Sequence, residues 1–213
     1  MPLAFPRCAV RPLSMARNGR PRSVPAVETG FPPIATGFPP IAAGDARVLV
    51  LGSMPGRASL QRGEYYAHPQ NAFWPIVGAI AGAGPELPYD QRAAVLQRCG
   101  LAVWDVLQSC ARTGSLDADI DKNSIVVNDF ATFFATHREL RAVFCNGGAA
   151  YGCYRRYVVP NLAVDWRALP LVQLPSTSPA HASLRLAEKL AVWSAAISPW
   201  LASCSNGEAP LIS

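Results

Sequence analysis

One stretch of the chain, residues 51–74, gathers residue types that can together hold a flat ring. It reads LGSMPGRASLQRGEYYAHPQNAFW. Tyr66 stands among Gly, Glu, His and Pro residues typical of a loop, where a ring can present its face to a planar base. Asn71 adds a neutral amide, although an isolated Asn before a helix is also typical of an N-cap. Phe73 and Trp74 lead into a predicted helix and are expected in the core.

A Gly-Ser-Met-Pro-Gly turn at residues 52–56 closes the strand that precedes this stretch. Its glycines let the chain turn sharply, so that backbone N–H groups around Ser53, Met54 and Gly56 can approach an atom that gains negative charge. Ordinary strand-to-helix loops look similar. The phosphate-binding pattern GxxxxGK[ST] is absent from the sequence.

Asp105 lies at the end of an apolar run that reads Ala-Val-Trp-Asp-Val. A carboxylate in such a run is costly unless it is paired or placed at the mouth of a site. There it could accept a hydrogen bond from a ring N–H. A loop-bracing or helix-capping role fits the sequence equally well.

A compact loop is predicted after the last strand, beginning at Pro175. Its hydroxyl and N–H groups can hold phosphate oxygens, and its tip can enter a groove. It comprises Ser176, Thr177, Ser178, Pro179, Ala180 and His181. His181 could contact a phosphate or simply be a surface histidine.

The elements that must position these residues follow an alternating pattern. Four apolar, β-branched runs are predicted strands, at residues 47–53, 100–107, 140–147 and 169–176. Helical windows separate them, which predicts an α/β fold: a three-layer α/β/α sandwich with a central four-stranded parallel sheet. Ligands bind at the carboxyl ends of such strands, where all the loops described above fall.

Composition divides the 213 residues into three parts. We expect a Pro/Arg-rich leader at 1–44, flexible at least to about residue 28, one domain at 45–203 and a tail at 204–213. The leader holds five arginines against one glutamate, a charge of +4, and the remainder has fourteen bases against thirteen acids. Within the leader, TGFPPIA occurs twice in succession at 29–42, which is typical of an extended linker whose second copy could lie over the edge of the domain.

The six cysteines form no CxxC pair and no group with the three histidines, so we expect no metal site and no cofactor. Several of them are predicted buried thiols. No apolar stretch reaches transmembrane length and the N-terminus has no continuous hydrophobic region, so we expect a cytoplasmic protein that does not contact membranes. We also expect a monomer.

Five motifs, in this order and spacing, resemble the uracil-DNA glycosylase superfamily and, within it, the hypoxanthine-DNA glycosylase branch called family six. They read LGSMPG, YYAHPQNAFW, VWDVLQSCARTGSLD, VFCNG and PSTSPAH. The resemblance covers about residues 31–200 and implies a four-stranded parallel sheet between helices.

The resemblance also implies roles for individual residues. Asn71 falls on the asparagine that positions the attacking water in the hypoxanthine branch, which favours this role over an N-cap. Tyr66 matches the aromatic residue that stacks on the flipped base in the mismatch-specific branch. Asp105 falls where the uracil-specific enzymes have an asparagine that reads the base. Met54 and Leu174 depart from related branches, which have a water-positioning asparagine and a histidine there. Loss of that histidine implies weaker leaving-group assistance.

The expected activity is hydrolytic removal of a deaminated base from DNA, with hypoxanthine as the favoured base and uracil also accepted. The motif stretches contain no lysine, so a Schiff-base step is not expected and the product is an abasic site. The alternatives are a mismatch-specific uracil/thymine glycosylase and a protein that binds damaged DNA or a nucleotide without catalysis.

Overall fold

The computed structural model describes residues 33–114 and 116–201. The tail predicted at 204–213 and most of the predicted leader lie outside these residues. A parallel sheet in the order β3-β2-β6-β7 forms the centre of the folded unit. Its strands are β2 (Val48–Gly52), β3 (Leu101–Asp105), β6 (Ala142–Asn146) and β7 (Leu171–Leu174). Each strand lies inside one of the four predicted ranges, which confirms the predicted sheet.

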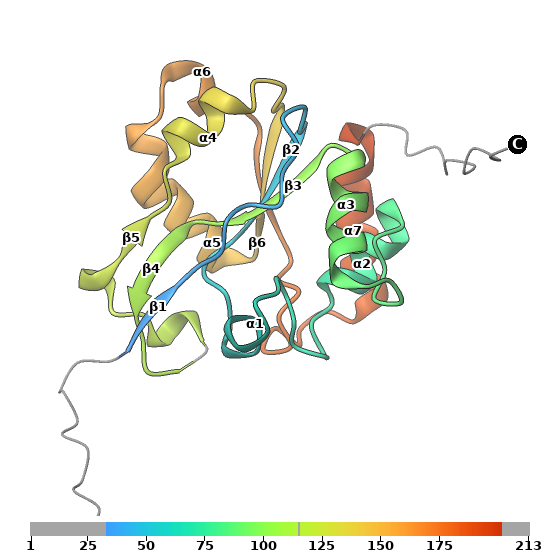
Figure 1. The fold of residues 1–213 in the computed structure, drawn as a ribbon, viewed down its shortest axis with the longest axis horizontal. Helices are drawn as coiled ribbons and strands as arrows, with labels where there is room; N and C mark the ends of the chain where they lie inside the picture. The colour runs from blue at the N-terminus through green and yellow to red at the C-terminus, as the bar shows by residue number, and fades with distance from the viewer. Residues whose placement is uncertain (1–32, 115, 202–213) are drawn as a thin grey trace, which may run out of the picture. The chain divides into compact units, whose positions relative to one another are not determined.

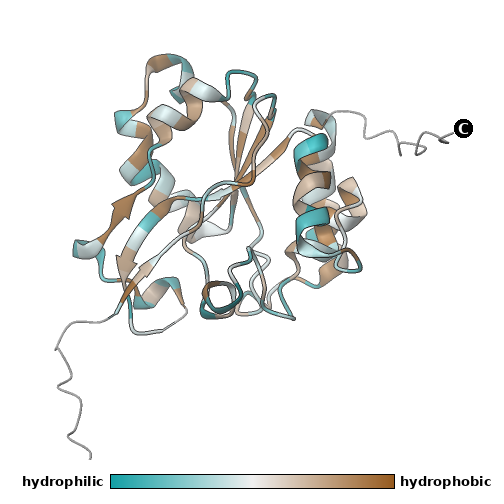
Figure 2. Cartoon of the chain, in the orientation of Figure 1, coloured by the Kyte–Doolittle hydropathy of each residue, from teal (hydrophilic) through white to brown (hydrophobic). Residues whose placement is uncertain are grey.

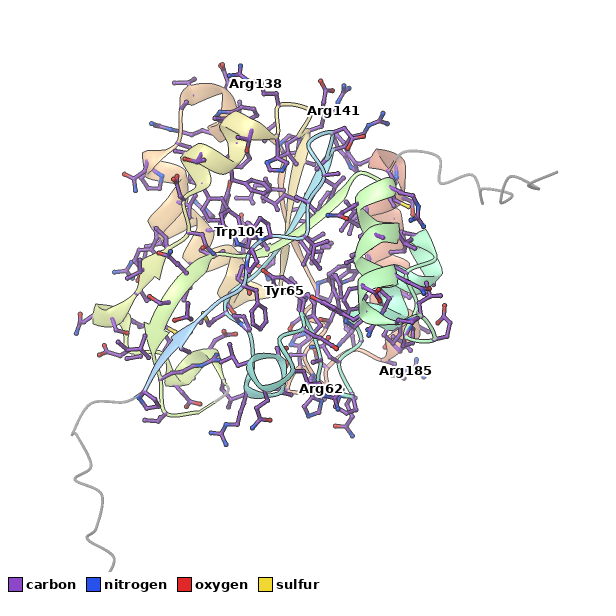
Figure 3. The ribbon with its side chains drawn as sticks, in the orientation of Figure 1. Arg62, Tyr65, Trp104, Arg138, Arg141 and Arg185 are labelled. Atoms are coloured by element: carbon purple, nitrogen blue, oxygen red, sulfur yellow. The ribbon has the colours of Figure 1, made fainter. Side chains whose placement is uncertain are left out.

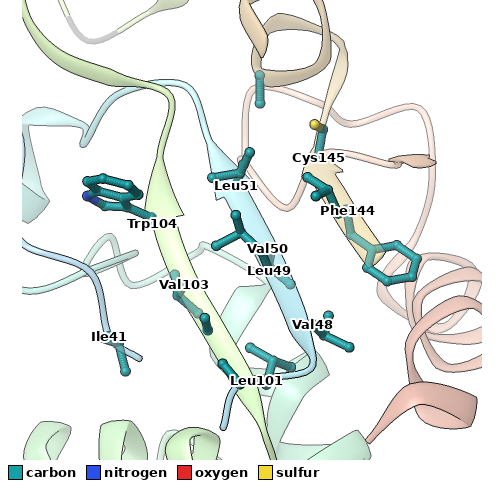
Figure 4. Close-up of a cluster of buried hydrophobic side chains, with 14 of the residues drawn as sticks. Ile41, Val48, Leu49, Val50, Leu51, Leu101, Val103, Trp104, Phe144 and Cys145 are labelled. Atoms are coloured by element: carbon teal, nitrogen blue, oxygen red, sulfur yellow. The ribbon is translucent and has the colours of Figure 1, made fainter. Parts of the chain in front are cut away.

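The strands form where apolar residues run without interruption. Every residue of β2 and β3 is buried, as expected for strands covered on both faces. Figure 4 shows their side chains, among them Val50 and Val103, packed together with Phe144 of β6. Hydrophobic colour gathers on these central strands and alternates with polar colour along the flanking helices (Figure 2). This pattern is what amphipathic helices on a buried sheet produce.

Helices cover both faces of the sheet (Figure 1). One layer contains α2 (Phe73–Ala81), α3 (Tyr89–Arg98) and α7 (Leu186–Ile197). The other contains α4 (Phe130–Thr136), α5 (Gly148–Cys153) and α6 (Val164–Arg167). The three-layer sandwich is therefore confirmed. Within the described residues, no helix combines the length and the apolar character needed to cross a membrane.

A second, antiparallel sheet is a feature that the sequence analysis did not predict. Its order is β1-β4-β5, with β1 (Ile34–Thr36), β4 (Leu107–Ala111) and β5 (Val126–Val127). Strand β4 begins two residues after β3 ends, so the apolar run predicted as one strand belongs to two sheets. Asp105 is consequently the last residue of β3, at the carboxyl edge of the central sheet.

The second copy of the TGFPPIA repeat is part of the folded unit. The N–H of Ile41 donates to the carbonyl of Val103, and the N–H of Val103 donates to the carbonyl of Ile41, with N···O distances of 2.9 and 2.8 Å. Ile41 thereby covers the open edge of β3. The side chains of Tyr65 and Trp104, labelled in Figure 3, both donate to the carbonyl of Phe38, at 3.3 and 3.1 Å. Paired structure thus starts at β1, inside the segment assigned to the leader, because even a proline-rich chain can satisfy an exposed strand edge.

Candidate active site

A cavity of about 510 Å³ opens at the carboxyl edge of the central sheet. Gly52, Asp105 and Asn146, the last residues of three neighbouring strands, all line it. The sequence-predicted residues that line it are Ser53, Met54, Gly56, Tyr66, Asn71, Asp105, Ser176, Thr177, Ser178, Pro179 and Ala180. Residues far apart in the sequence are therefore brought together in one hollow.

Gly52 leaves room for the polar atoms at the base of the cavity. It pairs with Asp105 across β2 and β3. A Cβ atom on Gly52 would collide with Asp105 Oδ1 and would lie 3.1 Å from the hydroxyl oxygen of Tyr66. The carboxyl of Asp105 and the hydroxyl of Tyr66 thus share the space above a residue without a side chain.

Asp105 is buried without the partners that a charged group requires. The residue is 3% exposed, and its Oδ2 atom has no hydrogen-bond partner among the described residues. Burial, reinforced by the negative charge of Asp117 and opposed by Arg112, raises the pKa of Asp105 to about 7. The carboxyl can therefore be neutral or charged near physiological pH.

Tyr66 is held in a strained conformation with one face covered. Its φ of 54° lies in the left-handed region, which is uncommon for a residue with a bulky side chain. Its ring stacks on Phe73 at 4.0 Å between centroids, and its buried hydroxyl has no hydrogen-bond partner among the described residues. Phe73 and Trp74 are 0% and 3% exposed, which confirms that they belong to the core.

Asn71 lies at the cavity wall just ahead of α2. Its Oδ1 atom accepts a hydrogen bond from the N–H of Phe73 at 3.0 Å. The helix itself has Ala72 as its N-cap residue. The side chain therefore serves the first turn of the helix and also faces the cavity. The amide oxygen has a second lone pair that this bond does not use.

The loop after β7 is tied to two other parts of the site. Asn146 Nδ2 donates to Thr177 Oγ1, and the N–H of Thr177 donates to Asn146 Oδ1, both at 2.8 Å. The N–H of Ala72 donates to the carbonyl of Thr177 at 3.0 Å. Because Ala72 directly follows Asn71, this bond ties the loop to the segment that carries the Asn71 amide.

Helix α7 holds both ends of the same loop. Trp193 Nε1 donates to the carbonyl of Pro175 at 2.9 Å, and Lys189 Nζ donates to the carbonyl of His181 at 2.8 Å. His181 is the one predicted site residue outside the main cavity. It lines a smaller adjoining hollow of about 240 Å³ together with Ser176 and other residues of the loop.

Three further residues shape the site without having been singled out from the sequence. Arg112, 5% exposed, donates to the carbonyl of Pro55, and Asp117 accepts a hydrogen bond from the Ser53 hydroxyl. Both belong to the segment after β4, and only their position in three dimensions reveals them. Asn146 carried a detectable signal, since an amide at the end of a buried strand resembles the case of Asp105.

Metal-ligand geometry is not found in the described part of the chain, where no group of three or more His, Cys, Asp or Glu residues could hold an ion. Cys110 and Cys145 are buried free thiols, as predicted for several cysteines. Burial raises the pKa of Cys145 to about 12, so this sulfur stays a thiol at neutral pH.

The fold and the cavity at the carboxyl edge of the central sheet define a class of proteins. Comparison with known families identifies that class. Residues 38–197 match the family model of the uracil DNA glycosylase superfamily, and the chain belongs to that superfamily.

Hypoxanthine DNA glycosylases of two archaea are similar to this chain. The one from Methanosarcina barkeri is 35% identical over 104 residues, which is 48% of this chain and 65% of that protein. The one from Methanosarcina acetivorans is 32% identical over 107 residues, which is 50% of this chain and 66% of that protein. The matches thus span just under two thirds of these relatives' lengths.

A solved structure is also similar. A candidate uracil DNA glycosylase from Methanosarcina acetivorans, determined by solution NMR, superposes with a TM-score of 0.61 at 29% identity. The match covers 76% of this chain and 98% of the other.

Proposed function

We propose that the chain is a DNA glycosylase that flips a deaminated base, most favourably hypoxanthine, and hydrolyses its N-glycosidic bond. The observation that carries the proposal is the cavity wall: an unpaired carboxyl, Asp105, an aromatic face, Tyr66, and a neutral amide, Asn71, meet in one hollow. The volume of about 510 Å³ lies within the range of small-ligand sites. The similar hypoxanthine DNA glycosylases support the choice of base.

Base selection follows from hydrogen-bond complementarity. Deamination of adenine replaces an amino donor with a carbonyl acceptor and adds a ring N–H. Asp105 offers an acceptor for that N–H, and backbone N–H groups between Ser53 and Gly56 offer donors for the carbonyl. Adenine would leave these buried groups unpaired. Uracil presents a similar edge, so we expect some uracil excision.

Flipping a nucleotide costs a few kcal/mol, which new contacts must offset. The free face of Tyr66 stacks on the base, and the hydroxyls of Ser176 and Ser178 contact phosphates. The tip of the loop, from Pro179 to His181, fills the vacated stack. The bonds from Trp193 and Lys189 support this role, because a wedge must not yield when it enters DNA.

Bond cleavage builds positive charge on the sugar and negative charge on the departing base. Asn71 is too weak a base to take a proton, so its amide oxygen orients the water, using the lone pair that Phe73 leaves free. No lysine is among the residues that line the described cavity, which supports a hydrolytic reaction and an abasic product.

A panel of labelled duplexes containing hypoxanthine, uracil, a thymine mismatch or xanthine tests the proposal. Abasic product that is fastest from hypoxanthine supports it. Fastest release from the mismatched pyrimidines indicates a mismatch-specific uracil/thymine glycosylase. The buried, apolar Met54 and Leu174 favour a non-catalytic alternative; tight DNA binding without abasic product at high enzyme concentration identifies such a protein.

A further inference from the structure

The carboxyl of Asp105 forms no salt bridge within the described residues, although Arg112 favours its charged form. Its Oδ2 atom is buried without a hydrogen-bond partner among the described residues. Arg112, the cation that acts on it, directs its guanidinium to the carbonyl of Pro55 instead. The hydroxyl of Tyr66, close to the same point above Gly52, makes no hydrogen bond of normal geometry in the described part of the chain, and the side chain of Asn146 is the polar group that acts on it. This arrangement suits a carboxylic acid better than a carboxylate.

Building on the proposed function, we infer that Asp105 works as a neutral acid that supplies the leaving-group assistance. Its O–H donates to the carbonyl oxygen of the flipped base while its other oxygen accepts from the adjacent ring N–H. A lactam, which is an N–H beside a C=O, satisfies both atoms and also gives the backbone N–H groups between Ser53 and Gly56 a carbonyl oxygen; adenine can pair with the acid through N1 and its amino group but offers those N–H groups no acceptor. The substrate class is therefore bases with a lactam edge, such as hypoxanthine, xanthine and uracil.

The same contact strengthens as the reaction proceeds. When the bond between the sugar C1′ and the base nitrogen breaks, its electron pair stays with the base and spreads onto the carbonyl oxygen. The O–H of Asp105 stabilises that charge and keeps its proton throughout. Water then adds to C1′ and loses a proton to solvent. Leu174, the last residue of β7, is apolar and 1% exposed and cannot donate to this charge, so Asp105 performs this task.

Several ionisable groups face the carboxyl from the surrounding elements. They are Tyr65 and Tyr66 ahead of α2, Tyr89 of α3, Arg112 and Asp117 after β4, and, acting on Tyr66, Cys145 of β6. Of these, Asp117 and Arg112 act on Asp105 itself, with opposite signs. The acid form of Asp105 predominates below its pKa of about 7 and is lost above it. Excision should therefore slow as the pH rises through this value.

Single-turnover excision of hypoxanthine, measured between about pH 5.5 and 9, tests the inference. For the wild-type protein we expect a rate that is level at low pH and falls about tenfold per unit above the pKa. Asp105→Asn keeps a donor and an acceptor but cannot ionise. Its rate should be nearly independent of pH and should exceed the wild-type rate at the alkaline end. Asp105→Ala should lose about 100-fold at pH 6.

Two controls separate this role from other sources of pH dependence. His68 lines the same cavity, so His68→Gln is the matched control and should keep the wild-type profile. Binding of each Asp105 variant to abasic-site DNA should stay within about threefold of wild type, since the loop after β7 is unchanged.

A wild-type rate that rises through pH 7, with a slow Asp105→Asn variant at every pH, would overturn the inference and make the carboxylate the working form. That result would leave the proposed glycosylase intact. Absence of abasic product from the wild-type protein at every pH would instead overturn the proposed function, and the inference with it.

Discussion

Among single residues, the ones that lack a partner reveal most about the site. Asp105 Oδ2 and the Tyr66 hydroxyl are buried and unpaired within the described residues. Each such group costs about 1–3 kcal/mol. Protein folds keep unpaired groups of this kind chiefly where a ligand completes them. Gly52 is the residue that makes the arrangement possible, because any side chain there would occupy the same space.

Gly52→Ala should therefore reduce excision about 100-fold, because its methyl group displaces the Asp105 carboxyl and the Tyr66 hydroxyl. Single-turnover assays and binding to abasic-site DNA measure the effect, and we expect binding to change little. Gly152→Ala is the matched control, since a Cβ there meets nothing within 4 Å. An unimpaired Gly52→Ala protein would contradict the placement of the reactive groups.

Asn71→Ala should abolish detectable excision while abasic-site binding persists. The same change removes the hydrogen bond to the N–H of Phe73, which should lower the free energy of unfolding by about 1 kcal/mol. Asn71→Ser retains an acceptor for that N–H but not the reach of the amide. It should recover the lost stability and stay inactive, as thermal melts and excision assays can show. Full activity in Asn71→Ala would refute the role.

At the level of elements, two parts of the chain far from the reacting atoms hold the site in place. Helix α7 binds both ends of the loop after β7 through Trp193 and Lys189. The second TGFPPIA copy covers the edge of β3 and receives hydrogen bonds from Tyr65 and Trp104. These contacts connect the position of Asp105, at the end of β3, to a segment that sequence patterns assign to a linker.

The two repeat copies provide a matched pair for this element. Ile34 and Ile41 occupy the same place in their copies, yet they are 75% and 8% exposed. Ile41→Ala should lower the free energy of unfolding by about 2–4 kcal/mol, and Ile34→Ala by less than about 0.5 kcal/mol. Chemical denaturation of both variants measures the difference. Equal losses would show that the second copy is not docked as described.

For the molecule as a whole, the site lowers stability in a pH-dependent way. The folded protein raises the pKa of Asp105 from 3.8 to about 7, so between these values the folded state binds more protons than the unfolded state. Stability must then fall as the pH rises through this window, and the full penalty remains above it. The proposed activity thus has a stability cost that grows toward alkaline pH.

Asp105→Asn should remove that penalty. The melting temperature of Asp105→Asn should exceed that of the wild-type protein, and the excess should be larger at pH 8 than at pH 5. The reason is that the folded wild-type protein ionises the Asp105 carboxyl between these two pH values, whereas the amide of the variant cannot ionise. Thermal melts at the two values provide the measurement. If the difference in melting temperature between the two proteins is the same at both pH values, the Asp105 carboxyl does not change its charge in this window.

The order of strands and helices could be predicted from the sequence because it depends on local pattern. Buried parallel strands appear as continuous apolar runs, and their carboxyl ends must meet at one edge. The candidate residues from Ser53 to Ala180 therefore converge on one cavity, as proposed. Short strands such as β1 and β5 escaped prediction, because two or three residues carry no periodic signal.

The protonation of Asp105 was decided only by the tertiary structure. Its pKa depends on burial and on Asp117 and Arg112, which approach it through the fold and carry no mark of that role in their sequence context. The burial of Ile41 and the exposure of Ile34, which occupies the same place in the first copy, were decided in the same way. Local pattern specifies which segments form, whereas electrostatic and packing energies depend on distances between segments that only the folded chain brings together.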